Sequence, residues 1–208
     1  MRRAALVAAL VAPLLLGCGS SAPTGSPRGE NCPTSAPAAL VGHELFDVRL
    51  VTTKGTITMR LAADSSPIAV ANFVALVSCG FYDDVIFHRI AYMGDGTPFV
   101  IQGGDPLGNG TGGPGYTIDD EPVVGSYRRG TLAMARTSAP NSQGSQFFIV
   151  LDDAAGPVLE QARTYAILGE VVEGMDVVDA IAAVERNDSD QPIDPITITS
   201  ATATPVAP

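Results

Sequence analysis

Three short segments constrain the fold of this chain most strongly, because each alternates in a way that suits a β-strand. They are residues 87–89 (Phe-His-Arg), 99–105 (Phe-Val-Ile-Gln-Gly-Gly-Asp) and 141–149 (Asn-Ser-Gln-Gly-Ser-Gln-Phe-Phe-Ile). A strand sends successive side chains to opposite faces. We therefore expect each segment to present one pair of residues on a common face, namely Phe87 with Arg89, Val100 with Gln102, and Gln146 with Phe148.

If these three faces converge, they form an apolar pocket that holds one permanent cation and two amides. Such a pocket suits a small apolar group whose neighbouring backbone amide accepts hydrogen bonds. The set offers no nucleophile, no carboxylate pair and no metal cluster. Because the chain has only two histidines, His43 and His88, and no metal-ligand spacing, we expect no metal site.

The rest of the domain reads as short strands separated by turns rich in glycine and proline. Residues 45–51 and 55–61 suit a hairpin, and residues 196–199 suit a closing strand. One helix is expected to start at Ser65-Ser66-Pro67 with a hydroxyl cap and to stop near Gly80, and a second is expected over residues 175–183. Many short strands with two helices predict a mainly β fold, a barrel with helices over its ends.

The N-terminal residues read as a secretion signal. Arg2 and Arg3 precede an apolar run, residues 4–16, which is too short to span a bilayer comfortably. The run ends in Leu-Leu-Gly-Cys, which is similar to a bacterial lipobox, where cleavage precedes a cysteine that carries lipid. We interpret residues 1–17 as a lipoprotein signal peptide and Cys18 as the lipidation site. An ordinary signal peptide that happens to contain Cys18 is the alternative.

Composition separates a tether from the domain. Residues 18–42 are rich in serine, proline and glycine and are expected to form a flexible linker, and residues 43–204 are expected to form one domain. Cys32 lies in this linker and Cys79 at a helix end, so their pairing in an oxidising envelope stays open. The net charge of −10 argues against binding to nucleic acid or to anionic headgroups through a basic face.

A series of motifs then runs in order through the domain. By these motifs the chain, from about Phe46 to Thr199, resembles the cyclophilin-type peptidyl-prolyl cis-trans isomerases. The resemblance implies a closed eight-stranded antiparallel β-barrel capped by two α-helices, which isomerises X-Pro bonds without a cofactor. The motifs are residues 55–57 (GTI), 71–73 (ANF), 80–83 (GFYD), 87–89 (FHR), 101–105 (IQGGD), 112–116 (GGPGY), 132–136 (LAMAR), 141–148 (NSQGSQFF) and 169–175 (GEVVEGM).

The resemblance also assigns the site. Isomerisation needs no nucleophile, because rotation about a peptide bond has only to break amide resonance, a barrier of roughly 18–20 kcal/mol. Arg89 is the expected donor to the proline nitrogen in the twisted state, with Gln102 fixing Arg89 or the substrate carbonyl. On the residues alone, a surface arginine or a structural ion pair is the alternative. Phe99 completes the expected catalytic set, and the expected substrate-binding residues are Val100, Ala135, Arg136 (through its backbone), Asn141, Ser142, Gln146, Phe148 and Tyr165.

Two functions remain in competition. The first is an isomerase that assists folding of envelope or secreted proteins, with proline-containing polypeptides as partners and no nucleic acid. The second is a lipid-anchored module that binds proline-containing peptides, with isomerisation incidental. Either form is expected as a monomer in a bacterial cell envelope, at the outer membrane or periplasmic face, touching the membrane only through Cys18. The loop from Ala91 to Pro98 is about five residues longer than the common family form, and this mildly favours the second function.

His88 is expected to point away from Arg89, since neighbours in a strand alternate. We interpret it as a core histidine whose ring nitrogens are satisfied, in preference to an acid–base catalyst. The proposed chemistry therefore depends on Arg89. Whether Gln102 and Phe99 face Arg89 depends on the long loop that follows Arg89 in the chain.

Overall fold

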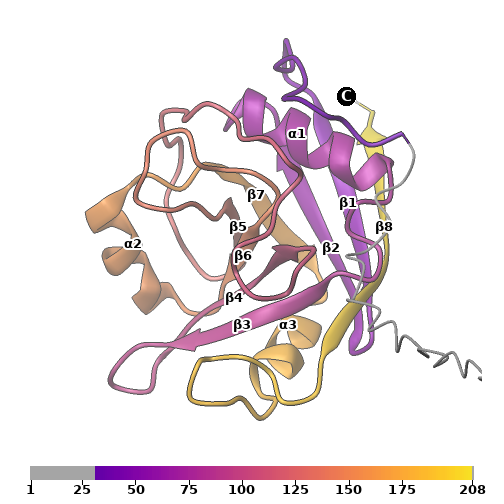
Figure 1. The fold of residues 1–208 in the computed structure, drawn as a ribbon. Coiled ribbons are helices and arrows are strands. Elements are labelled where there is room, and N and C mark those ends of the chain that lie inside the picture. The colour runs from indigo at the N-terminus through magenta and orange to yellow at the C-terminus, as the bar shows by residue number, and fades with distance from the viewer. Residues whose placement is uncertain (1–30, 208) are drawn as a thin grey trace, which may run out of the picture.

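The computed structural model describes residues 31–207, whose strands close into a barrel (Figure 1). Neighbouring strands are antiparallel in the order β1-β2-β7-β5-β6-β4-β3-β8, so the expected closed eight-stranded antiparallel barrel is confirmed. The strands are β1 (Leu45–Thr52), β2 (Gly55–Ala62), β3 (Ile86–Tyr92), β4 (Pro98–Asp105), β5 (Thr131–Met134), β6 (Phe147–Val150), β7 (Ile167–Glu173) and β8 (Ile196–Val206).

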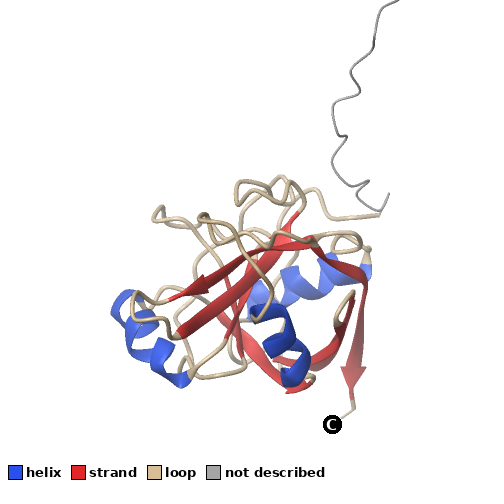
Figure 2. Ribbon diagram, turned by 90° about the horizontal axis from the view of Figure 1, so that it is seen from below, coloured by secondary structure: helices blue, strands red, loops and turns tan. Residues whose placement is uncertain are grey.

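Two helices lie where they were expected, and a third was not foreseen. Helices α1 (Pro67–Ser78) and α3 (Met175–Ala182) lie at the top and bottom of the barrel in Figure 1. Helix α2 (Gly156–Ala162) follows a short 3-10 helix, η1 (Asp153–Ala155), and stands to one side, as Figure 2 also shows. The two expected helices are therefore confirmed, and α2 is an additional one. Only Gly156 and Leu159 of α2 are buried, so this short helix lacks the apolar periodicity that reveals one in a sequence.

The start of α1 is stabilised from a distant part of the chain. Ser66 was expected to cap the helix, but its hydroxyl makes no capping bond and is directed at the carbonyl oxygens of Ser65 and Ile167, at 2.7 and 3.0 Å. The carboxylate of Glu121 instead accepts the backbone N–H groups of Ile68 and Ala69, each at 2.8 Å. A carboxylate is also favourable at this positive end of the helix dipole. The cap is therefore a tertiary contact, which local sequence does not reveal.

Phe147 of β6 lies at the centre of the barrel interior. Its ring meets the rings of Phe73 and Phe87 edge-on, with centroids 5.5 and 5.9 Å apart. All three side chains are completely buried. Because side chains alternate along a strand, burial of Phe147 turns its neighbours Gln146 and Phe148 to the outer surface. The core therefore positions two residues that the sequence assigned to the site.

A bulge in the β3–β4 pairing changes which residues share a face. Phe87 pairs with Gly103 and Arg89 pairs with Gln102, so His88 is an extra residue in β3. A bulge of this kind breaks the alternation of side chains. Phe87 is completely buried, whereas the side chain of Arg89 is 44% exposed on the outside. The expectation that Phe87 and Arg89 share a face is therefore wrong.

The long loop after Arg89 forms the end of a β-hairpin. Strands β3 and β4 stay paired as far as Tyr92 and Pro98, and residues 93–97 close the turn. The hairpin projects at the lower left of Figure 1. It does not come between Arg89 and Gln102, which pair directly across the two strands. The additional residues lengthen the hairpin and leave the site strands in register.

The described part of the expected linker is attached to the domain. Cys32 forms a disulfide with Cys79, just after the end of α1, and the backbone N–H of Leu40 donates to the carbonyl oxygen of Pro67. The expected signal peptide and the lipidation site Cys18 lie outside the described residues. Among residues 31–207, no helix is long and apolar enough to cross a bilayer.

Candidate active site

A row of polar side chains crosses the outer face of β3, β4 and β6. The Nη1 atom of Arg89 lies 3.5 Å from Oε1 of Gln102, and Nε2 of Gln102 donates to Oε1 of Gln146 at 2.9 Å. The amide of Gln102 is thereby orientated with its oxygen towards the guanidinium. This arrangement brings together three residues that the sequence assigned to the site.

Gln146 is itself held by the loop after β4. Its Nε2 atom donates to the carbonyl oxygens of Gly110 and Gly112, at 3.0 and 2.9 Å. The buried carboxylate of Asp105 shapes this loop by accepting several backbone N–H groups, including that of Leu107. Burial alone would raise the pKa of Asp105, but these donors outweigh it and hold the pKa below its usual value. The row of amides therefore ends in a preorganised loop.

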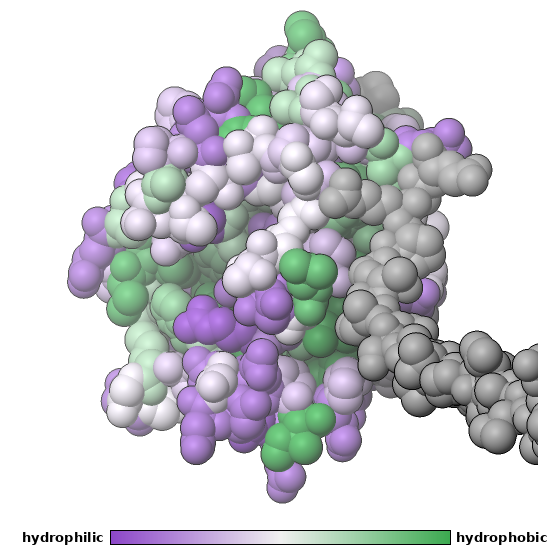
Figure 3. Space-filling view, viewed as in Figure 1, coloured by the Kyte–Doolittle hydropathy of each residue, from purple (hydrophilic) through white to green (hydrophobic). Residues whose placement is uncertain are grey.

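An apolar slot adjoins this row on the same outer face. Val100 and Phe148 are almost completely buried in it, and the ring of Tyr165 meets that of Phe148 edge-on at 5.3 Å. Phe99 and Val100 are adjacent in sequence, yet both join the slot, because the β3–β4 register shifts at Phe99. Ala135 also packs against this cluster. Figure 3 shows hydrophobic residues in a hollow on the left of this face, above hydrophilic ones.

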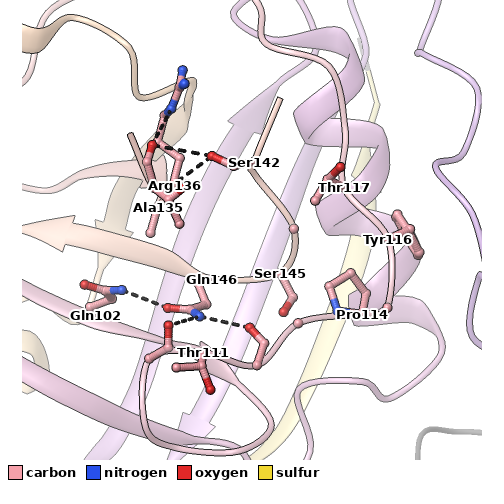
Figure 4. A pocket seen from close by; sticks show the side chains of 16 residues that line it. Gln102, Thr111, Pro114, Tyr116, Thr117, Ala135, Arg136, Ser142, Ser145 and Gln146 are labelled. Carbon is pink, nitrogen blue, oxygen red and sulfur yellow. Dashed lines mark hydrogen bonds between the residues drawn. The ribbon is translucent and has the colours of Figure 1, made fainter. Parts of the chain in front are cut away.

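A cavity of about 680 Å³ opens beside the slot, and Gln102 and Gln146 of the polar row form part of its wall. Figure 4 shows Gln102 and Gln146 on one side of the cavity, with Pro114 and Tyr116 across from Ser142. The site therefore consists of a polar row with space for peptide on both sides.

The loop that follows β5 contains the other expected substrate-binding residues. The side chain of Arg136 is only 8% exposed, and its Nη1 atom pairs with Asp120 at 3.0 Å. Ser142 lines the cavity and donates to the carbonyl oxygen of Ala139. Asn141 does not line the cavity, because its side-chain oxygen accepts the backbone N–H of Asp120. Arg136 and Asn141 thus hold the loop in shape through a shared partner.

His88, the bulged residue next to Arg89, is 4% exposed. Neither ring nitrogen has a hydrogen-bond partner among residues 31–207. The expectation of a core histidine holds, but the expectation that its nitrogens are satisfied is wrong. The bulge turns the ring into the protein. Burial lowers the pKa of His88; the negative charge of Asp105 opposes this effect and the positive charge of Arg89 adds to it, and the net shift is downward.

We expect His88 to make the domain less stable in mild acid. Its pKa is lowered on folding from 6.5, so the unfolded chain binds the proton more readily below that pH. Stability should therefore fall as pH drops through 6.5, with a slope of at most about 1.4 kcal/mol per pH unit. Urea unfolding between pH 5 and 8 measures the slope in wild type and in His88→Asn.

This experiment needs a variant background that lacks His43, because His43 changes the pH dependence of stability in the opposite direction to His88. The hydrogen bond and charge of Asp64 raise the pKa of His43, so folding favours its protonated form. In a His43→Asn background, His88 is the one histidine left to titrate. Substituting His88 there should flatten the slope, and an unchanged slope would contradict the assignment.

Sequence reasoning missed residues that support the site from other segments. Tyr127 donates its hydroxyl to the carbonyl oxygen of Tyr165 at 2.8 Å and packs behind the slot. Burial raises the pKa of Tyr127 to about 12, so it stays a donor. Asp190 lies on the loop between α3 and β8, with a carboxylate oxygen 3.7 Å from Nε of Arg89. Neither residue lies in a recognisable motif, and only the tertiary fold brings them to the site.

A closed antiparallel barrel that presents an arginine, two amides and an apolar slot on its outer face suits the binding of an extended peptide. The family model for the cyclophilin type peptidyl-prolyl cis-trans isomerases matches residues 47–203. The chain therefore belongs to this family, whose enzymes isomerise X-Pro peptide bonds.

Individual relatives agree with the family model. The chain is 43% identical to peptidyl-prolyl cis-trans isomerase cypE of Dictyostelium discoideum, over 75% of this chain and 96% of that protein. It is 39% identical to peptidyl-prolyl cis-trans isomerase B of Streptomyces anulatus, over 73% and 92% of the two chains. A cyclophilin from Cryptosporidium parvum, crystallised in the presence of the dipeptide Ala-Pro, superposes with a TM-score of 0.66 at 36% identity. That match covers 75% of this chain and 97% of the other.

Proposed function

We propose that Arg89 is the residue that accelerates isomerisation. The observation that carries this proposal is the place of its guanidinium: half-exposed, aligned by Gln102, and paired on β3–β4 next to the apolar slot. In the planar ground state the proline nitrogen shares its lone pair with the carbonyl group. In the twisted transition state the lone pair is localised and accepts a hydrogen bond, so a donor there stabilises the transition state selectively.

Arginine suits this role because it stays protonated and offers several donors in a rigid fork. The slot of Phe99, Val100 and Phe148 would hold the proline ring, while Gln102 orientates the guanidinium. No proton is transferred and no covalent bond is made. Uncatalysed X-Pro isomerisation takes tens to hundreds of seconds, so a donor acting only in the transition state has a large barrier to lower. Substitution of Arg89 tests the proposal directly, with loss of isomerisation in a folded domain as the expected outcome.

We further propose that the enzyme acts on envelope or secreted polypeptides while anchored by lipid on Cys18. Two observations support this compartment. The segment that ends at Cys18 is similar to a bacterial lipobox, and the Cys32–Cys79 disulfide belongs to an oxidising environment. The disulfide also attaches the segment after the anchor to the domain itself. The hairpin leaves Arg89 paired with Gln102, which supports an isomerase over a module that only binds.

Replacing Cys18 by serine tests the anchor. In a bacterial host, the wild-type chain should be recovered with membranes and should incorporate a labelled fatty acid. Cys18→Ser should lose the label and leave the membrane fraction. A Cys32→Ser variant is the matched control, since it removes a different cysteine and should stay membrane-bound. Equal membrane recovery of the Cys18→Ser chain would refute lipid anchoring.

A further inference from the structure

A carboxylate contacts the catalytic candidate Arg89 from a segment about one hundred residues away in sequence. The Oδ2 atom of Asp190 lies 3.7 Å from Nε of Arg89. Nη1 of the same guanidinium is directed at Gln102, and Nη2 donates no hydrogen bond to any of residues 31–207. Two nitrogens of the fork thus have partners within the protein, and one is free to meet a substrate.

The backbone of Asp190 is anchored beside Arg89. The N–H of Ile90, the residue after Arg89, donates to the carbonyl oxygen of Asp190 at 2.7 Å. Asn187 closes the loop around Asp190, because its side-chain oxygen accepts the backbone N–H groups of Ser189 and Gln191. The carboxylate is therefore presented by a short, hydrogen-bonded turn joined to β3.

Asp190 has a positive φ of 62°. Residues other than glycine seldom adopt this left-handed conformation, and aspartate and asparagine tolerate it best. Glycine would relieve the backbone cost at this position but would bring no charge to Arg89. The observed residue combines tolerance of the turn with a carboxylate.

A second arginine holds the same carboxylate from the other oxygen. Nε of Arg186 lies 3.5 Å from Oδ1 of Asp190, and the guanidinium of Arg186 stacks 4.0 Å above the ring of Tyr92. The hydroxyl of Tyr92 donates to the carbonyl oxygen of Ala182 in α3. Tyr92 lies at the base of the lengthened hairpin, so this hairpin contributes the platform on which Arg186 rests.

We propose that Asp190 is a positioning residue for isomerisation: it holds the guanidinium of Arg89 so that the free nitrogen faces the substrate. This inference rests on the proposed role of Arg89. A long, half-exposed arginine side chain has many rotamers, and a donor contributes fully only when it is already aimed. Gln102 restrains one nitrogen and Asp190 restrains another. Tyr92 supports Arg186, Arg186 pairs with Asp190, and Asp190 pairs with Arg89. The barrel therefore restrains Arg89 through this series of contacts.

The test is Asp190→Asn, which keeps a residue that tolerates the left-handed turn and removes the charge. Both partners are partly exposed, so we expect kcat to fall about two- to fivefold with KM unchanged. The difference from wild type should narrow between about 0.1 M and about 1 M salt, because the screening length falls from about 10 Å to about 3 Å. The Nε–H resonance of Arg89 should exchange faster with water in the variant.

Asp188→Asn is the matched control, since it removes one negative charge from an exposed position of the same loop and should leave kcat unchanged. Equal kcat in wild type and Asp190→Asn would overturn the proposal, as would an equal loss in Asp188→Asn. Circular dichroism and thermal unfolding verify that both variants fold. Failure of the underlying function is distinguishable, because an Arg89→Ala enzyme with full activity would refute the role of Arg89 itself.

Discussion

Replacing Arg89 by alanine should lower kcat/KM for a short X-Pro peptide by about 100- to 1,000-fold, the usual effect of removing one preorganised transition-state donor. The loss should appear in kcat, because the donor meets the proline nitrogen only in the twisted state. Peptide binding should weaken little, since the apolar slot of Val100 and Phe148 is retained. A protease-coupled assay, or exchange between cis and trans peptide signals in NMR, measures the rate.

Arg49→Ala provides the matched control for this experiment. Arg49 is an exposed arginine on β1, and β8 separates this strand from β3 in the closed barrel. Within residues 31–207, its side chain donates only to the hydroxyl of Thr56. The control should keep the wild-type rate. Full activity in Arg89→Ala would refute the mechanism, whereas lysine at position 89 should recover part of the rate, because it brings a charge without the fork.

Removing the Cys32–Cys79 disulfide should destabilise the domain by about 2–4 kcal/mol. The bridge joins cysteines 47 residues apart, and closing a loop of that size restricts the unfolded chain by about 4 kcal/mol in the chain-entropy model. The double variant Cys32→Ser/Cys79→Ser avoids leaving one reactive thiol. Urea unfolding of the wild-type and double-variant chains measures the loss as a lower midpoint.

A reducing agent distinguishes the effect of losing the disulfide from the effect of the two serine substitutions. Reduction should lower the unfolding midpoint of the wild-type chain and leave that of the double variant unchanged. Isomerase activity of the folded variant should equal that of the wild type, because the bridge lies at the end of α1, outside the site. An unaltered midpoint in the reduced wild-type chain would show that the disulfide contributes nothing to stability.

The sequence predicted much of the site, through the alternation of side chains along strands and through the order of the motifs. Gln102 and Gln146 meet as expected, since each lies on the outer face of a regular strand or just before one. The alternation rule failed at His88 and at Phe99, where an extra residue enters the β3–β4 pairing. A bulge depends on how two strands register with each other, so neither strand alone reveals it.

Long-range capping and charge pairing were also hidden from the sequence. Glu121 caps α1 from more than fifty residues away, and Asp190 reaches Arg89 from the loop before β8. Both are acidic residues in unremarkable loops, where a solvated side chain is the ordinary outcome. Likewise, the spacing of Cys32 and Cys79 left their pairing open, because a disulfide depends on proximity in space.

The sequence by itself predicted the barrel, the family and Arg89 as the candidate donor. Alternation and turn residues indicated short strands and helices, and the ordered motifs, through their resemblance to the family, implied the closed eight-stranded barrel and the role of Arg89. Only the tertiary structure decided which way Arg89 points and what holds it there. That outcome depends on the bulge at His88, on the amides beyond Gln102 and on the carboxylate of Asp190. Each is a contact between segments distant in the chain, and such contacts exist only once the barrel has closed.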